Sequence, residues 1–296
     1  MRVLISGASG LVGTELRRQL TAAGHTPISL VRGRAAGKDE ILWNPSAGDL
    51  PADALDGIDA VVNLGGATTG KIPWTKDYKT EIVASRLDST RTLVAAINAA
   101  KKPPKVLVSG SASGFYGDSG DNVLDEDSPK GAGFLADLAA QWESEALKAK
   151  TRVVLVRTTM VMSRKLGALG RLLPLLRIGL GGKLGNGRQW WAWISLPDEA
   201  RAIIHLIENQ DASGPYNLTA PEPATCGQII KSLAKHLHRP VLATVPAFVL
   251  RLVLGEAAVE LLLCSQNMSA QRLLDTGFKF EHPTLDSASA WVVGRD

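Results

Sequence analysis

A short glycine-rich turn between an apolar run and an amphipathic stretch constrains this chain most. The turn reads Gly7-Ala8-Ser9-Gly10-Leu11-Val12-Gly13, with residues 1–5 before it and 14–24 after it. This order indicates a strand, a tight turn and a helix. Glycines in such a turn let backbone N–H groups approach a pyrophosphate, and the helix dipole favours its negative charge. We therefore expect a dinucleotide site, although the glycine spacing alone is also compatible with an ordinary strand-to-helix turn.

Strands and helices alternate through the first half of the chain. We expect strands at 3–6, 27–31, 41–43, 60–64, 106–109 and 153–157, and helices at 14–24, 78–100 and 134–149. Continuous apolar strands separated by helices indicate a parallel sheet covered on both faces. The predicted fold class is α/β, a Rossmann-type doubly wound parallel sheet.

The pattern loosens after residue 163, and later helices are expected at 198–209, 226–238 and 246–263. We predict a smaller, mainly helical C-terminal substrate lobe made of 164–193 and 223–296. The cofactor domain would comprise 1–163, with 194–222 returning to it.

Composition excludes several classes of partner. The 296 residues carry 33 basic and 29 acidic side chains, and no Lys/Arg run argues for nucleic acid. The most apolar stretch, 241–264, contains Arg251, Glu256 and Glu260 and is a poor membrane span. Cys226 and Cys264 are too isolated for a metal site. Because Met1 leads straight into a strand, we expect a cytoplasmic protein with reduced cysteines. We also expect that it binds neither a membrane nor a metal, and that it is a monomer or a homodimer.

The residues after two strands bear on the choice of cofactor. Val31 is followed by Arg32, with Arg34 and Lys38 nearby, where NAD-preferring folds often have an acidic residue. An arginine fork suits a phosphate, so NADP(H) is favoured, the alternative being a solvated basic loop. After the strand at 60–64, small residues allow either close approach of a cofactor or a simple turn.

Several motifs in fixed order carry a family resemblance. They are GASGLVG (7–13), VVNLGGA (61–67), SGSASGFYG (109–117) and DEDSP (125–129), followed by GLGGKLGNGRQWWAWIS (179–195). Together they resemble an extended short-chain dehydrogenase/reductase of the NAD-dependent epimerase/dehydratase superfamily. More narrowly, the chain is similar to the uncharacterised epimerase-family branch, also labelled SulA-like nucleoside-diphosphate-sugar epimerase. Further motifs of that branch run nearly end to end, including Ser85-Arg86, Trp142-Glu143 and Gly277-Phe278-Lys279-Phe280.

The resemblance implies a set of cofactor contacts along the carboxyl edge of the sheet. These are Gly7, Ser9, Gly10, Leu11, Val12, Gly13, Val31, Arg32, Leu64, Gly65, Glu81, Arg86 and Val161. Without the resemblance, Glu81 and Arg86 would be interpreted as a surface pair on one helix.

The superfamily's usual catalytic pair is missing. Its chemistry needs Tyr-x-x-x-Lys, in which the lysine lowers the tyrosine pKa. The three tyrosines here are followed four residues later by Ile82, Gly120 and Ala220, and the expected pair falls at Leu135 and Ala139. The branch that this chain resembles also commonly lacks the pair.

The candidate catalytic hydroxyls are therefore Ser111 and Tyr116, just past the strand at 106–109. Tyr116 would keep a pKa of about 10 and be a poor base. The alternative is a packed ring with a capped hydroxyl. Trp190, Trp191 and Trp193 would either stack on a flat ligand or pack the lobe.

Two functions remain open on these residues. One is an NADP(H)-binding oxidoreductase or epimerase acting on a small carbonyl compound, either sugar-nucleotide-linked or aromatic. The other is a catalytically weak NADP(H)-binding sensor or scaffold.

Overall fold

A central parallel sheet organises the molecule. The computed structural model describes residues 1–33, 37–164, 169–241 and 243–294. Within them, neighbouring strands of a seven-stranded sheet are all parallel, in the order β11-β7-β5-β4-β1-β2-β3. The bounds are β1 (Arg2–Ser6), β2 (Thr26–Val31), β3 (Glu40–Leu42), β4 (Ala60–Asn63), β5 (Val106–Ala112), β7 (Arg152–Thr158) and β11 (Gly214–Leu218). The chain reverses its winding between β1 and β4, which is where doubly wound sheets bind ligands.

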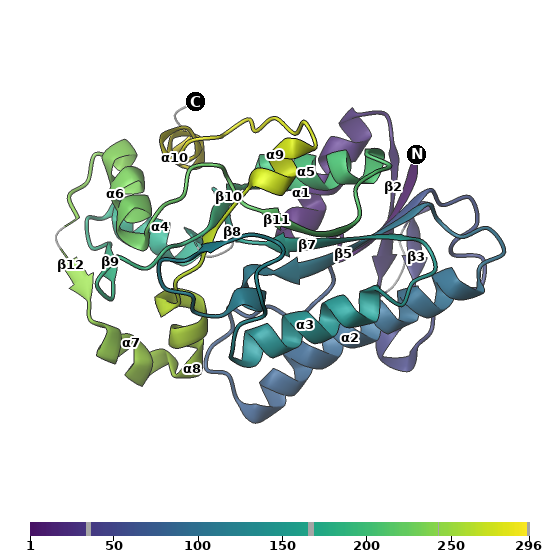
Figure 1. Cartoon of the computed structure of the whole chain (residues 1–296), viewed down its shortest axis with the longest axis horizontal. Coiled ribbons are helices and arrows are strands. Elements are labelled where there is room, and N and C mark those ends of the chain that lie inside the picture. Colours follow the sequence, from purple (N-terminus) through teal and green to yellow (C-terminus); the bar gives the residue numbers. More distant parts are fainter. Residues whose placement is uncertain (34–36, 165–168, 242, 295–296) are drawn as a thin grey trace.

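Helices cover both faces of this sheet. In Figure 1, α1 (Leu11–Ala22) and α5 (Leu196–Glu208) lie above it, and α2 (Lys76–Ala99) and α3 (Phe134–Ala146) lie below it. Each face has its own buried apolar cluster, with Leu16 and Ile203 on the α1/α5 side and Leu93 and Ile97 on the other. Because both faces are covered, apolar residues follow one another along the central strands instead of alternating with polar ones, as in Val3–Ile5 and Val106–Val108.

A second group of helices lies at the left of Figure 1. It contains α4 (Leu169–Arg177), α6 (Cys226–Leu237), α7 (Ala247–Leu254), α8 (Glu256–Ala258), a π-helical turn at Val259–Leu263, and α10 (Leu285–Val293). Helices α4, α6 and α10 share a separate apolar core around Trp193, Ile229 and Val292, and Leu262 of the π-helical turn packs against it. The remaining helical segments are Pro45–Ala47, Ser113–Tyr116 and α9 (Gln271–Asp275).

Three short parallel pairs connect distant parts of the chain. They are β8 (Met160–Met162) with β10 (Trp193–Ser195), β9 (Gly182–Leu184) with β12 (Ala243–Val245), and β6 (Val123–Leu124) with β13 (Asn267–Met268). None was predicted, because two- or three-residue strands leave no periodic signal.

The predicted fold class is confirmed, and every strand predicted for the sheet is present. Strand β5 continues to Ala112, three residues beyond the prediction, whereas α3 ends at Ala146. The proposed division into cofactor domain and lobe remains a proposal. Leu273 and Phe278, which were assigned to the lobe, pack in the core on the α1/α5 side of the sheet, because the chain doubles back there.

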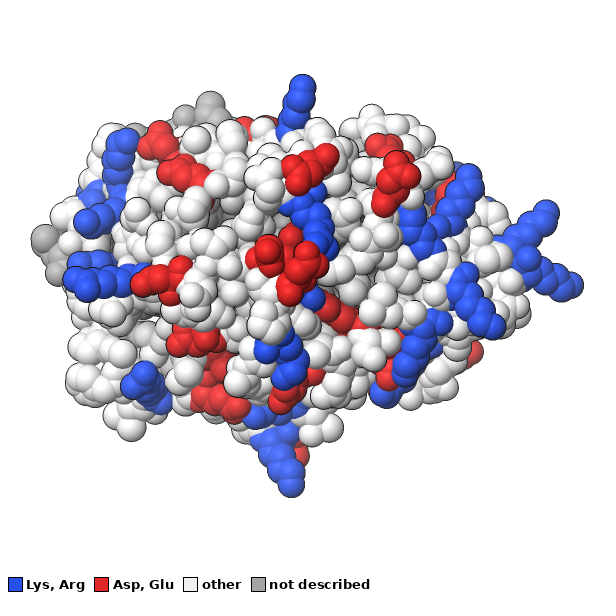
Figure 2. Space-filling model, in the orientation of Figure 1, with Lys and Arg blue, Asp and Glu red and all other residues white. Residues whose placement is uncertain are grey.

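The surface and the helix lengths bear on partners. Lys/Arg and Asp/Glu side chains are mixed over the face in Figure 2. Among the described residues, no helix is both long and apolar enough to cross a membrane.

Candidate cofactor-binding site

The turn between β1 and α1 is too crowded for side chains at two of its glycines. Gly7 has φ +72°, and a Cβ atom there would lie 2.6 Å from the Leu64 carbonyl oxygen and 2.9 Å from the Gly65 nitrogen. At Gly13 a Cβ atom would lie 2.2 Å from the Gly7 oxygen. Three of the predicted contacts, Gly7, Leu64 and Gly65, are therefore direct neighbours. The backbone itself forms the surface at this edge of the sheet.

Helix α1 begins without a side-chain cap. Its N-cap residue, Gly10, provides none, and its first turn has no acidic residue. By contrast, α2, α5, α6 and α10 are capped by the hydroxyls of Thr75, Ser195, Thr225 and Thr284.

Helix α3 also starts after a glycine, Gly133, and has no cap of its own. However, the Glu260 carboxylate accepts hydrogen bonds from the backbone N–H groups of Phe134 and Leu135, both at 2.7 Å. Helix α1 differs from these five helices because its first turn meets no side-chain acceptor among the described residues. A free helix N-terminus on a glycine turn is a site for an anion such as a phosphate.

A buried polar network fixes the loop after β4. Ser6, Asn63 and Ser109 align across β1, β4 and β5. The Ser6 hydroxyl donates to Asn63 Oδ1 at 2.5 Å and accepts from the Gly65 N–H at 3.1 Å. Asn63 Nδ2 donates to the Thr90 hydroxyl at 2.9 Å, as does the Trp142 indole N–H. The sequence motifs did not predict this hydrogen-bond network. Its sign in the sequence is a polar residue at the end of an apolar strand.

The remaining predicted contacts lie around the same edge. Val12, Leu64 and Val161 are partly buried and pack against one core cluster. Val31 is half-buried at the end of β2, and Arg32 is exposed just beyond it. Ser9 and Gly10 are exposed, and Leu11 is half-buried. Arg34 lies outside the described residues.

Arg86 is held beside the loop after β4, but Glu81 is not. Arg86 Nη1 donates to the carbonyls of Ala67 and Ile82, both at 3.0 Å, and its guanidinium lies over the Trp142 ring. Burial lowers the pKa of Arg86 to about 10. Glu81 is exposed on α2, and within the described residues no ion pair joins it to Arg86.

The two candidate catalytic hydroxyls are buried. The Ser111 hydroxyl donates to Glu143 Oε1 at 2.6 Å. The Tyr116 side chain is 1% exposed, accepts from Arg157 Nη1 at 2.8 Å and contacts Asn217 Oδ1 at 2.7 Å. Burial raises the Tyr116 pKa to about 12, so the expected value of about 10 was wrong. This geometry matches the packed-ring alternative, and the catalytic role of both residues stays a prediction.

The positions of the missing pair lie at the start of α3. Leu135 packs against the Ser113–Tyr116 turn, because a Cβ atom on Gly114 would lie 2.9 Å from the Leu135 Cβ. Ala139 is buried one turn later.

The three tryptophans bond within the protein. Trp193 is fully buried and donates to the Glu222 carbonyl, and Trp191, which is also buried, donates to the Leu262 carbonyl. Trp190 is half-buried and donates to Asp121. For Trp191 and Trp193, packing rather than ligand stacking is the role that the structure supports.

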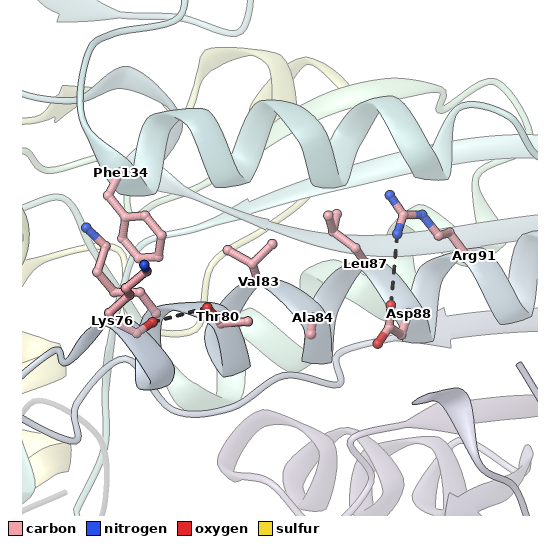
Figure 3. A pocket seen from close by; sticks show the side chains of 9 residues that line it. Lys76, Thr80, Val83, Ala84, Leu87, Asp88, Arg91 and Phe134 are labelled. Carbon is pink, nitrogen blue, oxygen red and sulfur yellow. Dashed lines mark hydrogen bonds and ion pairs between the residues drawn. The ribbon is translucent and has the colours of Figure 1, made fainter. Parts of the chain in front are cut away.

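An open groove lies away from these residues. Figure 3 shows it along α2, from Lys76 to Arg91, with Phe134 reaching over it from the start of α3. Its volume is about 650 Å³. None of the predicted cofactor contacts lines it, so it is a separate feature of the surface.

Comparison with known proteins adds to this geometry. The model of the NAD dependent epimerase/dehydratase family matches residues 3–219, and a domain of unknown function, DUF1731, matches residues 245–292. An epimerase family protein of Mycobacterium leprae is 40% identical over 296 residues, covering 99% of this chain and 96% of that protein.

Two solved structures are also similar. The human epimerase family protein SDR39U1 (isoform 2) with NADPH has a TM-score of 0.92 and 33% identity, covering 99% of both chains. MoeE5 in complex with UDP-glucuronic acid and NAD has a TM-score of 0.78, covering 98% of this chain and 97% of that one. At 22% identity, MoeE5 shows a shared fold alone.

Proposed function

This chain belongs to the NAD dependent epimerase/dehydratase family, and we propose that it binds NADP(H) at the carboxyl edge of its sheet. There it would act as an oxidoreductase or epimerase on a small carbonyl or nucleotide-linked substrate, in a cytoplasmic setting. The bound nicotinamide would supply hydride transfer.

The observation that carries the proposal is the glycine turn with the uncapped start of α1. Gly7 and Gly13 admit no Cβ atom, and the first-turn N–H groups of α1 meet no side-chain acceptor among the described residues. A pyrophosphate would accept from these N–H groups and complement the helix dipole. Val12, Leu64 and Val161 would provide apolar contacts beside it.

Preference for NADP(H) rests on two observations. Arg32 follows β2 and is exposed, so its guanidinium is available to a ribose 2′-phosphate. The human relative SDR39U1 has been solved with NADPH. Other relatives of this fold bind NAD, so the phosphate is a specific claim about Arg32.

An aspartate at position 10 tests the phosphate site. Gly10 is extended, with φ −73° and ψ 176°, as an N-cap residue should be. In Gly10→Asp the new carboxylate would cap α1 and occupy the anion position. A Cβ atom at position 10 would lie 3.2 Å from the Gly7 carbonyl oxygen, a cost that Gly10→Asp and Gly10→Ser share, so we expect similar melting temperatures for these two variants. For Gly10→Asp we expect about a hundredfold weaker NADPH binding by fluorescence titration, since like charges then meet.

Gly10→Ser is the matched control, because its neutral hydroxyl also caps α1. It should weaken NADPH binding much less than Gly10→Asp does. If both variants bind NADPH as tightly as the wild type, the pyrophosphate does not lie at α1.

The second candidate function is an NADP(H)-binding sensor or scaffold with little turnover. It is favoured by Leu135 and Ala139 at the positions of the missing pair and by the enclosed Tyr116 hydroxyl. NADPH oxidation measured against a panel of carbonyl compounds detects a reductase. An epimerase returns its hydride and leaves the cofactor unchanged, so it is detected by chromatographic conversion of nucleotide-linked sugars. Tight NADPH binding with neither reaction supports the sensor, whereas either reaction supports the enzyme.

A further inference from the structure

Two glutamates of the C-terminal region reach the sheet domain from one helical segment. Glu256 and Glu260 lie four residues apart in α8 and the π-helical turn that follows it. Glu256 Oε2 lies 2.8 Å from Lys79 Nζ on α2. Glu260 accepts from two first-turn N–H groups of α3, those of Phe134 and Leu135. The segment 256–263 is thus attached to the starts of α2 and α3.

The contact of Glu260 is built for a carboxylate. The N-cap residue of α3 is Gly133, whose φ is +117°, and a Cβ atom there would lie 2.8 Å from Glu260 Oε1. The glycine therefore makes room for a carboxylate that arrives from more than 120 residues away in sequence. Two charge-assisted hydrogen bonds and a favourable helix dipole then hold it.

The same contact continues to the candidate catalytic turn. Leu135, whose N–H donates to Glu260, packs its side chain against Gly114. Gly114 belongs to the Ser113–Tyr116 turn that follows β5. A displacement of Glu260 would therefore act on α3 and, through Leu135, on this turn.

Helix α7 is weakly packed, whereas 256–263 is also held by buried Ala257 and Ala258 and by the Leu262 carbonyl, which accepts from Gln189 and Trp191. In α7 only Leu250 is buried, while Phe248 is 69% and Leu252 83% exposed. Gly255, with φ +60° and open space around it, joins α7 to α8. Segments with so little apolar burial open at a low free-energy cost unless other contacts hold them.

We infer that Glu260 is a positioning residue that couples the segment 247–263 to the start of α3 and to the Ser113–Tyr116 turn. Glu256 contributes less, because its ion pair with Lys79 is partly exposed. The inference does not require the proposed cofactor or reaction, since both partners belong to this chain.

Hydrogen–deuterium exchange of the whole protein without ligand tests the coupling. Glu260→Gln should speed exchange about tenfold both in 134–138 and in 247–263, because a neutral amide replaces a charged double acceptor. Glu256→Gln, four residues away, is the matched control and should change either segment less than about twofold. Exchange in α1 should stay unchanged in both variants, which shows that the fold is intact.

Faster exchange at 134–138 alone would make Glu260 a local cap and overturn the coupling, as would no change in either segment. If Glu260→Gln also speeds exchange in α1, the milder variant Glu260→Asp is measured in its place. Exchange must then again become faster in both 134–138 and 247–263. An NADPH titration on the same samples reports the proposed function separately, so failure of one does not imply failure of the other.

Discussion

At the scale of single residues, Glu199 carries the clearest energetic consequence. It lies fully buried in the first turn of α5, and among the described residues only the Thr158 hydroxyl donates to it, at 2.7 Å. Its second carboxylate oxygen has no hydrogen-bond partner within the described structure. Burial raises the pKa of Glu199 to about 8, and the Thr158 hydrogen bond opposes this only in part. The side chain is therefore protonated in the folded protein at neutral pH.

This protonation makes the free energy of unfolding depend on pH. The unfolded chain loses the Glu199 proton near pH 4.5, whereas the folded chain keeps it to about pH 8. Between these values the folded state binds more protons, so stability falls as pH rises, by at most about 1.4 kcal/mol per pH unit. Above the folded pKa both states are ionised and the dependence ends.

Replacing Glu199 by glutamine should remove this contribution. Glu199→Gln keeps an oxygen to accept from Thr158 and cannot ionise. In urea unfolding at pH 5, 6, 7 and 8, the variant should gain stability relative to the wild type at each step upward. A constant difference between the two proteins across this range would contradict the raised pKa.

The sequence predicted the backbone conformation of the site better than the contacts of its side chains. Glycines 7 and 13 were predicted from spacing, because a close backbone approach leaves a sequence signature. The burial of Tyr116 and the carboxylate of Glu260 at α3 arise from tertiary neighbours, including Asn217 beside Tyr116, which lies 101 residues away, and Phe134 beside Glu260, which lies 126 residues away. Local sequence holds no signal for such neighbours.

At the scale of elements, a buried ion pair joins α3 to β7. Arg157 Nε and Nη2 donate to the two oxygens of Glu143 at 2.8 and 2.9 Å. The guanidinium also donates to Tyr116 and lies 3.6 Å from the Phe115 ring centre. Because these charges are out of water, each requires the other.

Removing one partner of this pair should be costly. Arg157→Met leaves the Glu143 charge buried, and we expect a loss of about 3–5 kcal/mol in the free energy of unfolding. Arg91→Met is the matched control. Arg91 of α2 forms a surface ion pair, at 3.1 Å, with Glu145, which lies in α3 like Glu143. Arg91→Met should cost less than about 1 kcal/mol. Urea unfolding of both variants checks this, and similar losses would refute the distinction.

Element prediction succeeded where periodicity is strong. The apolar strands of the sheet and the helices between them were expected within a few residues. Pairs such as β6 with β13 were not expected, because the two strands are far apart in sequence and meet only in the folded protein.

At the scale of the whole molecule, the sheet brings the glycine turn, the loop after β4 and the end of β2 to one edge. Alternating strands and helices were sufficient to predict this, since parallel strands share a carboxyl edge. The packing of Leu273 and Phe278 in the core beside the sheet was not predictable. An apolar side chain indicates burial but does not indicate in which of two cores it is buried.

The central claim is that this edge binds NADP(H) with Arg32 at the 2′-phosphate. The most direct test is fluorescence titration of NADPH and NADH with the wild type and Arg32→Asp. We predict that the wild type binds NADPH at least about tenfold more tightly than NADH, and that Arg32→Asp removes this preference by weakening NADPH alone. Equal affinity of the wild type for both, or equal weakening of both by Arg32→Asp, would contradict it.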